Sequence, residues 1–106
     1  ATYLSDVDRD RAYWDALWSI RRGMIEQALG AGRRRLLDVG ASGGFLLEHF
    51  RRAGWRVFGI EPSRSAVRHA RERFDLDVFC GDLLAFDLGS DRDWREGGGE
   101  LFDAIH

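Results

Sequence analysis

The stretch LLDVGASGGFLLEHF, residues 36–50, decides the fold. It starts as an apolar run, reaches Asp38, and opens into a loop in which three of the five residues from 40 to 44 are glycine. A short apolar run without alternation is typical of a parallel strand buried on both faces. Leu46 and Phe50 then stand at helical spacing. A strand, a glycine loop and a helix therefore follow one another, which is an arrangement that lets the backbone come close to a ligand.

The rest of the chain alternates helical and strand-like segments. Periodicity and turn residues predict, in order, helix 5–30, strand 35–39, helix 43–54, strand 55–61, helix 62–74, strand 76–82, a surface loop 86–100 and strand 101–106. The first helix is expected to turn inward Trp14, Leu17, Trp18, Met24, Ile25, Ala28 and Leu29. Alternating strands and helices of this length imply right-handed crossovers and a parallel sheet with helices on both faces. The prediction is a Rossmann-like α/β three-layer sandwich over residues 31–106, preceded by a helix within residues 1–30.

Three acidic residues occupy the same place relative to three successive strands. Asp38 ends the first strand, Glu61 ends the second, and Asp82 follows the third. The carboxyl ends of parallel strands meet at one rim, and ligands of such sheets bind there. We therefore expect these carboxylates to lie around one binding site.

The glycine loop is a poor phosphate site. It contains no Lys or Arg, and the neighbouring acids would repel an anion. The pattern GxxxxGK[ST] is absent, and the dinucleotide pattern GxGxxG would need glycine at 40, 42 and 45, where Ser42 and Phe45 break it. Carboxylates suit hydroxyl and ammonium groups, so a nucleoside with a ribose diol and a cationic tail fits better.

Four segments, LLDVGASGG, VFGIEPS, CGDL and FDAI, together resemble class I S-adenosylmethionine-dependent methyltransferases, in the family's order. The first has the form D-x-G-x-G-x-G, in which Asp38, Gly40 and Gly44 match. Ser42 replaces the middle glycine. This side chain is tolerable if the φ angle of Ser42 is negative, and its hydroxyl could contact the ligand.

Carried over by position, the resemblance implies a cofactor site made of Asp38, Gly40, Ser42, Gly44, Glu61, Pro62, Asp82 and Leu83. Asp38 would hold the methionine ammonium, and Glu61 would accept hydrogen bonds from both ribose hydroxyls. Asp82 would bind the adenine amino group and Leu83 the ring, with Ile60 and Pro62 as apolar walls. Gly40 and Gly44 would let the loop pass under the cofactor. The implied activity is methyl transfer from S-adenosyl-L-methionine to an acceptor that the sequence does not name.

Composition limits the kinds of substrate and binding partner that we expect for this chain. The formal net charge of −2 argues against a nucleic-acid substrate, so we expect a small-molecule acceptor. No apolar run approaches the roughly 20 residues of a membrane span, and the single Cys80 fits a reducing, cytoplasmic setting. We expect Cys80 to be a buried small residue, and no set of His and Cys is spaced for a metal site.

The family's sheet usually has seven strands in the order 3-2-1-4-5-7-6, whereas this sequence contains four. We therefore expect the order 3-2-1-4, a domain truncated after the fourth strand, and a bare edge there that could drive self-association.

Two other functions remain open. The chain could be a non-catalytic nucleoside- or partner-binding module, or an NAD-dependent oxidoreductase, which Ser42, Phe45 and Asp38 disfavour. No general base is evident. His49 and His69 are expected inside helices away from the rim, in structural roles, whereas His106 follows the fourth strand, where the family often lines its active site.

Overall fold

The sheet is parallel and has the predicted strand order. The computed structural model describes residues 9–32, 34–82 and 102–106. Its four strands run in the order β3-β2-β1-β4, with bounds β1 (Arg35–Val39), β2 (Arg56–Glu61), β3 (Val78–Cys80) and β4 (Ala104–Ile105). The two outer strands are shorter than predicted. The topology confirms the Rossmann-like α/β class.

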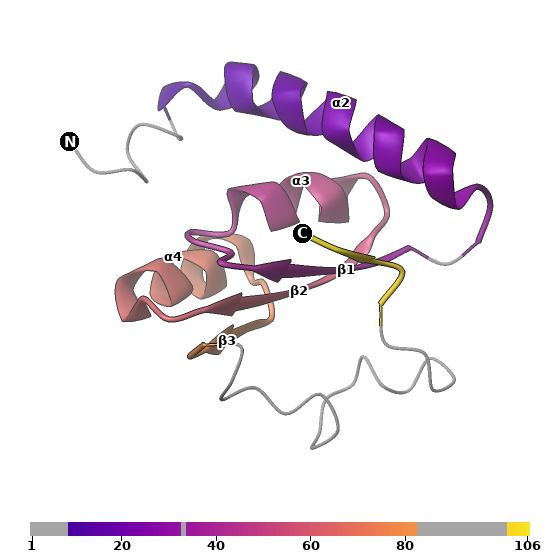
Figure 1. The fold of residues 1–106 in the computed structure, drawn as a ribbon. Helices are drawn as coiled ribbons and strands as arrows, with labels where there is room; N and C mark the ends of the chain where they lie inside the picture. Colours follow the sequence, from indigo (N-terminus) through magenta and orange to yellow (C-terminus); the bar gives the residue numbers. More distant parts are fainter. Residues whose placement is uncertain (1–8, 33, 83–101) are drawn as a thin grey trace.

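Three described helices lie on one side of this sheet (Figure 1). They are α2 (Arg11–Leu29), α3 (Phe45–Arg52) and α4 (Arg64–Phe74). Helices α3 and α4 share one core with Leu36 and Val78 of the sheet, and α2 lies over α3, with Trp18 joining that core. Burying these apolar side chains is the main source of stability, at about 25 cal/mol per Å² of apolar surface.

A second, smaller cluster lies on the opposite face of the sheet. It consists of Leu37, Phe58 and Ile60, with Phe79 and Phe102 packed against them. No helix among residues 9–32 and 34–82 covers this face. Ile60 is almost fully buried there, so its expected role as a wall beside adenine is wrong, because the strand alternation turns its side chain away from α3 and α4.

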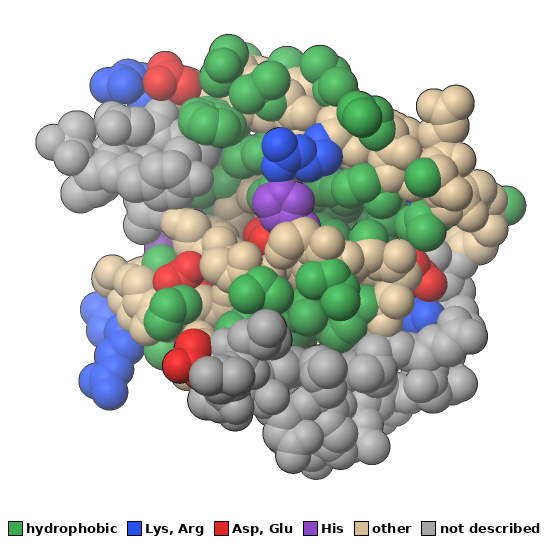
Figure 2. Space-filling model, in the orientation of Figure 1, with side chains coloured by type: hydrophobic (Ala, Val, Ile, Leu, Met, Phe, Trp, Pro, Cys, Tyr) green, Lys and Arg blue, Asp and Glu red, His purple; other side chains and the backbone are tan. Residues whose placement is uncertain are grey.

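Helix α2 meets the core along a narrower stripe than predicted. Trp18 is buried and Trp14 and Ile25 pack against the core. Leu17 and Met24, in contrast, are 40% and 67% exposed, and Ala28 and Leu29 are also exposed. The prediction was wrong for these four residues because α2 packs mainly against α3, so a second apolar flank of α2 remains exposed. Figure 2 shows this flank as a row of hydrophobic side chains.

One ion pair joins the start of β1 to the segment before β4. Arg35 donates from Nε to Oδ2 of Asp103 at 3.1 Å, and its backbone amide donates to the same oxygen at 2.9 Å. The guanidinium is nearly fully buried, so removing its partner would leave an uncompensated buried charge. Asp103 belongs to the FDAI segment, and this ion pair gives it a structural role.

None of the helices in the described part of the chain is long and apolar enough to cross a membrane. Two earlier expectations fall outside the described residues: the start of the first helix near residue 5 and the surface loop 86–100.

Candidate functional site

The glycine loop folds back on the end of β2. The amides of Gly40 and Ala41 both donate to the carbonyl of Ile60, at 2.8 and 3.0 Å. Gly40 and Gly44 have φ angles of 80° and 89°, which an L side chain rarely adopts. These two glycines therefore set the path of the backbone from β1 into α3.

Ser42 also has a positive φ angle, 53°. The condition under which a side chain is tolerated here without strain, a negative φ angle, is therefore not met. The Ser42 amide donates to Oε1 of Glu61 at 2.7 Å, and a charge-assisted bond of this kind offsets the backbone strain. Ser42 is therefore a strained residue that Glu61 holds in place.

Replacing Ser42 by glycine should stabilise the fold. Glycine removes a left-handed penalty of about 1–2 kcal/mol but loses more unfolded-state entropy, so we expect a net gain of about 0.5–1 kcal/mol in the free energy of unfolding. Urea denaturation measures it. Ser19→Gly on the exposed side of α2 is the matched control, and it should lower the stability by about 0.5 kcal/mol. A loss of stability in Ser42→Gly would contradict the strain.

Glu61 is only 9% exposed and holds two loops at once. Its Oε1 accepts from Ser42, and its Oε2 accepts from the amide of Ser63 at 2.8 Å. A carboxylate offers about four acceptor positions, so each oxygen keeps capacity for a further donor. The Ser63 hydroxyl in turn caps α4 by accepting from the Ala66 amide.

Gly44 serves helix packing. A Cβ atom there would lie 2.6 Å from Cδ1 of Leu76 and 2.9 Å from Cβ of Ala70. A Cβ at Gly40, in contrast, would meet nothing within 4 Å. Gly44 therefore lets the start of α3 approach α4, a role that the resemblance did not imply.

Asp38 is the most deeply buried of the three rim acids, with 4% exposure. Burial raises the pKa of its carboxyl above the usual range, and the nearby Glu61 charge adds to this rise, whereas a hydrogen bond from His106 opposes it. The bond joins Nδ1 of His106 to Oδ1 of Asp38 at 3.0 Å. No residue in the described part of the chain donates to Oδ2.

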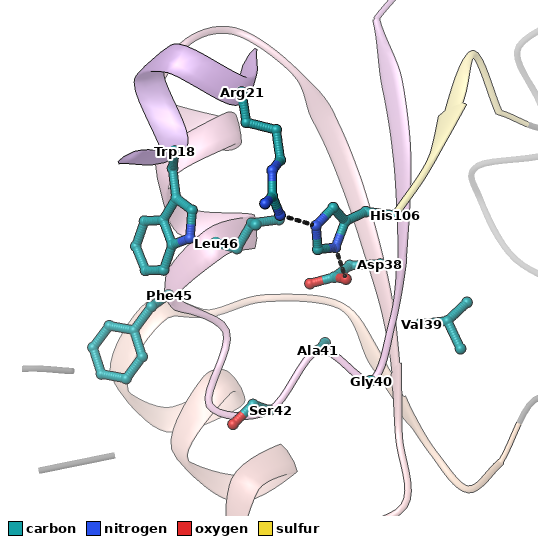
Figure 3. A pocket seen from close by; sticks show the side chains of 10 residues that line it. All are labelled: Trp18, Arg21, Asp38, Val39, Gly40, Ala41, Ser42, Phe45, Leu46 and His106. Carbon is teal, nitrogen blue, oxygen red and sulfur yellow. Dashed lines mark hydrogen bonds and ion pairs between the residues drawn. The ribbon is translucent and has the colours of Figure 1, made fainter. Parts of the chain in front are cut away.

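A cavity of about 150 Å³ opens beside Asp38 (Figure 3). Its lining comes from the end of β1, the glycine loop, the start of α3, helix α2 and His106: Trp18, Arg21, Asp38, Val39, Gly40, Ala41, Ser42, Phe45, Leu46 and His106. Three of the predicted site residues, Asp38, Gly40 and Ser42, therefore meet at one cavity. Figure 2 shows a basic side chain in contact with a histidine side chain in the middle of the face that it draws.

The other predicted residues lie outside this cavity. Glu61 accepts from the Ser42 amide of the loop but does not line the cavity. Gly44 is buried against α4, and Pro62 and Asp82 are exposed. Leu83 lies outside the described residues. The structure thus separates a closed part of the rim around Asp38 from an open part around Pro62 and Asp82.

Sequence reasoning missed the residues that α2 and α3 bring to the cavity. Trp18, Arg21, Phe45 and Leu46 belong to no motif, and Trp18 was assigned to the core alone. Arg21 Nη1 lies 2.7 Å from Nε2 of His106. The helical spacing of Trp14, Trp18 and Arg21 was the available signal, but it does not tell which side of α2 reaches the rim.

The remaining candidates divide into one confirmed prediction and two corrections. His49 is buried between Arg22 and Asp15, in the expected structural role, and burial lowers its pKa. His69 was expected away from the rim, yet its Nδ1 lies 2.7 Å from the Gly43 carbonyl, because Gly44 lets α4 come close to the loop. Cys80 is exposed, because it ends the edge strand β3.

Comparison with known proteins agrees with this fold. A family described as "Methyltransferase domain" matches residues 37–92, more than half of the sequence, and the chain belongs to that family. An Aromatoleum aromaticum protein named ubiquinone biosynthesis O-methyltransferase is 32% identical over 87 residues, which cover 82% of this chain and 32% of that protein. A protein of the same name from Alkalilimnicola ehrlichii is 43% identical over 53 residues, or 49% of this chain and 22% of that one.

Solved structures show the same fold. DesVI of Streptomyces venezuelae aligns with a TM-score of 0.64 and 29% identity, over 84% of this chain and 40% of its own. The amino pentose methyltransferase CalS10 of Micromonospora echinaspora, solved with bound S-adenosylmethionine, gives 0.67 and 29%, over 84% and 38%. This chain therefore spans about a third of the length of the first curated relative and about two-fifths of these structures.

Proposed function

We propose that this chain is the S-adenosyl-L-methionine-binding part of a methyltransferase. The observation that carries the proposal is Asp38: a buried carboxylate on the rim, beside a cavity, with Oδ2 free of any donor among the described residues. Such an oxygen fits an ammonium group, because a buried charge needs a partner. Family membership and the cofactor bound in CalS10 support the same reading.

The cavity offers partners for both charges of an amino-acid group. Asp38 would accept from the ammonium, and the Arg21 guanidinium, in the same cavity, would donate to the carboxylate. Apolar Trp18, Phe45 and Leu46 would line the space around them. When bound, the cofactor supplies an already activated methyl group, so the chain's task is to bind, align and exclude water.

The nucleoside would lie along the open part of the rim. Glu61 keeps acceptor capacity for the ribose hydroxyls. Pro62 and Asp82 are accessible, and Asp82 and Leu83 would form hydrogen bonds with adenine. In this proposal residues 31–106 are the cofactor-binding unit, and the helix within residues 1–30 closes the methionine end through Arg21 and Trp18.

A small-molecule acceptor is the proposed methyl recipient. The relatives are named for ubiquinone biosynthesis O-methylation and for amino pentose methylation, which suggests a hydroxyl or an amine. The net charge of −2 is consistent with a recipient other than nucleic acid.

Calorimetry tests the proposed function. Titration of the chain with S-adenosylmethionine, S-adenosylhomocysteine and NAD should give binding of the first two and no binding of the third. Binding of NAD alone would favour the oxidoreductase. A methyl-transfer assay then offers hydroxyl- and amine-bearing small molecules as acceptors and measures the release of S-adenosylhomocysteine. If the chain binds both adenosyl ligands but releases no S-adenosylhomocysteine in this assay, the non-catalytic module is favoured.

The affinity for S-adenosylmethionine should fall as the pH falls through the raised pKa of Asp38. Only the ionised carboxylate attracts the ammonium, and burial makes this carboxylate protonate at a higher pH than usual. Calorimetric titration across mildly acidic pH measures the effect. Asp38→Asn should bind weakly and without this pH dependence; a mutant with the wild-type profile would contradict the assignment.

The same substitution should stabilise the protein without ligand. Because the pKa of Asp38 is raised in the folded state, proton binding by Asp38 stabilises the folded protein. This contribution to the free energy of unfolding is complete below the unfolded pKa of about 3.9 and is lost as the pH rises through the folded pKa. Asp38→Asn should therefore melt at a higher temperature than the wild type at neutral pH, and the difference should shrink towards pH 3. A lower melting temperature at neutral pH would contradict the burial penalty.

Self-association through the β4 edge is part of the proposal. Strand β4 lies at one edge of the sheet, and Ile105 within it is 70% exposed. Unpaired edge groups invite pairing with another chain. Sedimentation velocity over a concentration series should show a reversible increase in mass, and Ile105→Lys should reduce it.

A further inference from the structure

Three side chains from different elements form one line at the cavity (Figure 3). His106, which follows β4, contacts Asp38 of β1 through Nδ1 at 3.0 Å. Its Nε2 contacts Arg21 of α2 at 2.7 Å. All three line the cavity. His106 therefore stands between the site's carboxylate and its guanidinium.

The two neighbours define the tautomer of His106. A guanidinium has donors only, so Nε2 must carry the lone pair that accepts from Arg21. A carboxylate accepts, so Nδ1 must carry the proton that is donated to Asp38. One neutral tautomer satisfies both contacts, whereas a ring with protons on both nitrogens would point an N–H group at Arg21.

Arg21 is free to leave this position. It lies on an exposed part of α2, and no other residue in the described segments forms a hydrogen bond or ion pair with it. Its neighbour Arg22, in contrast, is bonded to His49 and Glu26. A carboxylate that enters the cavity would attract Arg21 more strongly than a neutral imidazole does.

We propose that Arg21 caps His106, and that the carboxylate of a bound ligand draws Arg21 away and leaves an unprotonated Nε2 in the cavity as a proton acceptor. The inference rests on the proposed function, because the carboxylate is that of the cofactor's methionine end. The O–H or N–H bond of an acceptor would then break as its proton bonds to Nε2. The Asp38 carboxylate would balance the charge that the ring gains.

Ring-¹⁵N histidine spectra of the full chain test this proposal. S-adenosylhomocysteine is the ligand with a carboxylate, and 5′-methylthioadenosine is the matched nucleoside without the amino-acid group. We expect the Nε2 signal of His106 to move towards that of an unprotonated, unbonded nitrogen with S-adenosylhomocysteine and to remain in place with 5′-methylthioadenosine. Calorimetry on the same samples confirms that each ligand is bound.

Three variants make the result specific. His106→Asn assigns the signal, Arg21→Ala should give the released position without ligand, and Arg22→Ala should move the His49 signal and leave that of His106 unchanged. Equal responses to two bound ligands, or an Nε2 that is protonated in the complex, would overturn the cap while leaving the proposed function intact. Absence of binding by S-adenosylhomocysteine would overturn both.

Discussion

Gly44→Ala is expected to lower the free energy of unfolding by about 3 kcal/mol, since it combines a left-handed φ penalty of about 1–2 kcal/mol with overpacking of about 1–3 kcal/mol. The φ angle is 89°, and the new methyl group would lie 2.6 Å from Leu76 and 2.9 Å from Ala70. Both neighbours are buried in the main core, so neither has open space to move into. Chemical denaturation followed by circular dichroism measures the loss.

Gly40→Ala is the matched control for this substitution. Its φ angle of 80° is similar, but a Cβ there would meet nothing within 4 Å, so it should lose only the conformational part, about 1–2 kcal/mol. Leu76→Val combined with Gly44→Ala should cost less than the sum of the two single changes, because the nearest clashing atom is removed. Two results would show that packing does not decide the need for glycine at position 44. One is an equal loss of stability in Gly40→Ala and Gly44→Ala, and the other is a double variant whose loss equals the sum of the Gly44→Ala and Leu76→Val losses.

The sequence was sufficient for the architecture because local signals and the global fold agree. The run at 35–39 is apolar without alternation, and the run at 55–61 is rich in aromatic and β-branched residues; the structure makes them the central parallel strands β1 and β2. The inward residues of α4 were all correct, since Ala66, Val67, Ala70 and Phe74 are buried. Consistency between pattern and packing makes such elements predictable.

The prediction failed where a neighbouring element decides the outcome. Helix α2 has apolar residues on two flanks, and periodicity does not tell which flank meets α3. The hydrogen bond from the Ser42 amide to the Glu61 carboxylate joins residues 19 positions apart, so no local pattern indicated it. Cys80 is the last residue of the edge strand β3, so apolar context in the sequence did not imply burial.

The candidate site was predictable in part. Asp38 and Glu61 were predicted to share one rim because parallel strands bring their carboxyl ends together, and the structure places Asp38, but not Glu61, in the lining of the cavity. Arg21 reaches the same cavity from a helix that no motif connects to the glycine loop, whereas His106 was expected near an active site because it follows the FDAI segment. Contacts between residues so far apart in sequence follow from packing alone, so the structure was needed to find them.

Glu61→Ala is expected to weaken S-adenosylmethionine binding by about 100-fold or more, because two hydrogen bonds to a charged acceptor contribute about 1.5–3 kcal/mol each. The substitution also leaves the amides of Ser42 and Ser63 without their acceptor. The loop and the ribose contact would thus be lost together. Calorimetry at a temperature where circular dichroism shows the variant folded measures the affinity, and Glu72→Ala, an exposed glutamate of α4, is the matched control with unchanged binding.

The ribose contribution can be separated from the loop by a cycle of two proteins and two ligands. Adenosine carries the ribose diol, and 2′,3′-dideoxyadenosine lacks it, whereas loop disorder affects both equally. The wild type should prefer adenosine by about tenfold or more, and Glu61→Ala should lose most of that preference, since the cycle isolates the pairwise term. Glu61→Gln should keep part of it, because its amide oxygen still accepts one bond. If the preference for adenosine survives in Glu61→Ala, then Glu61 serves the loop and another group holds the ribose.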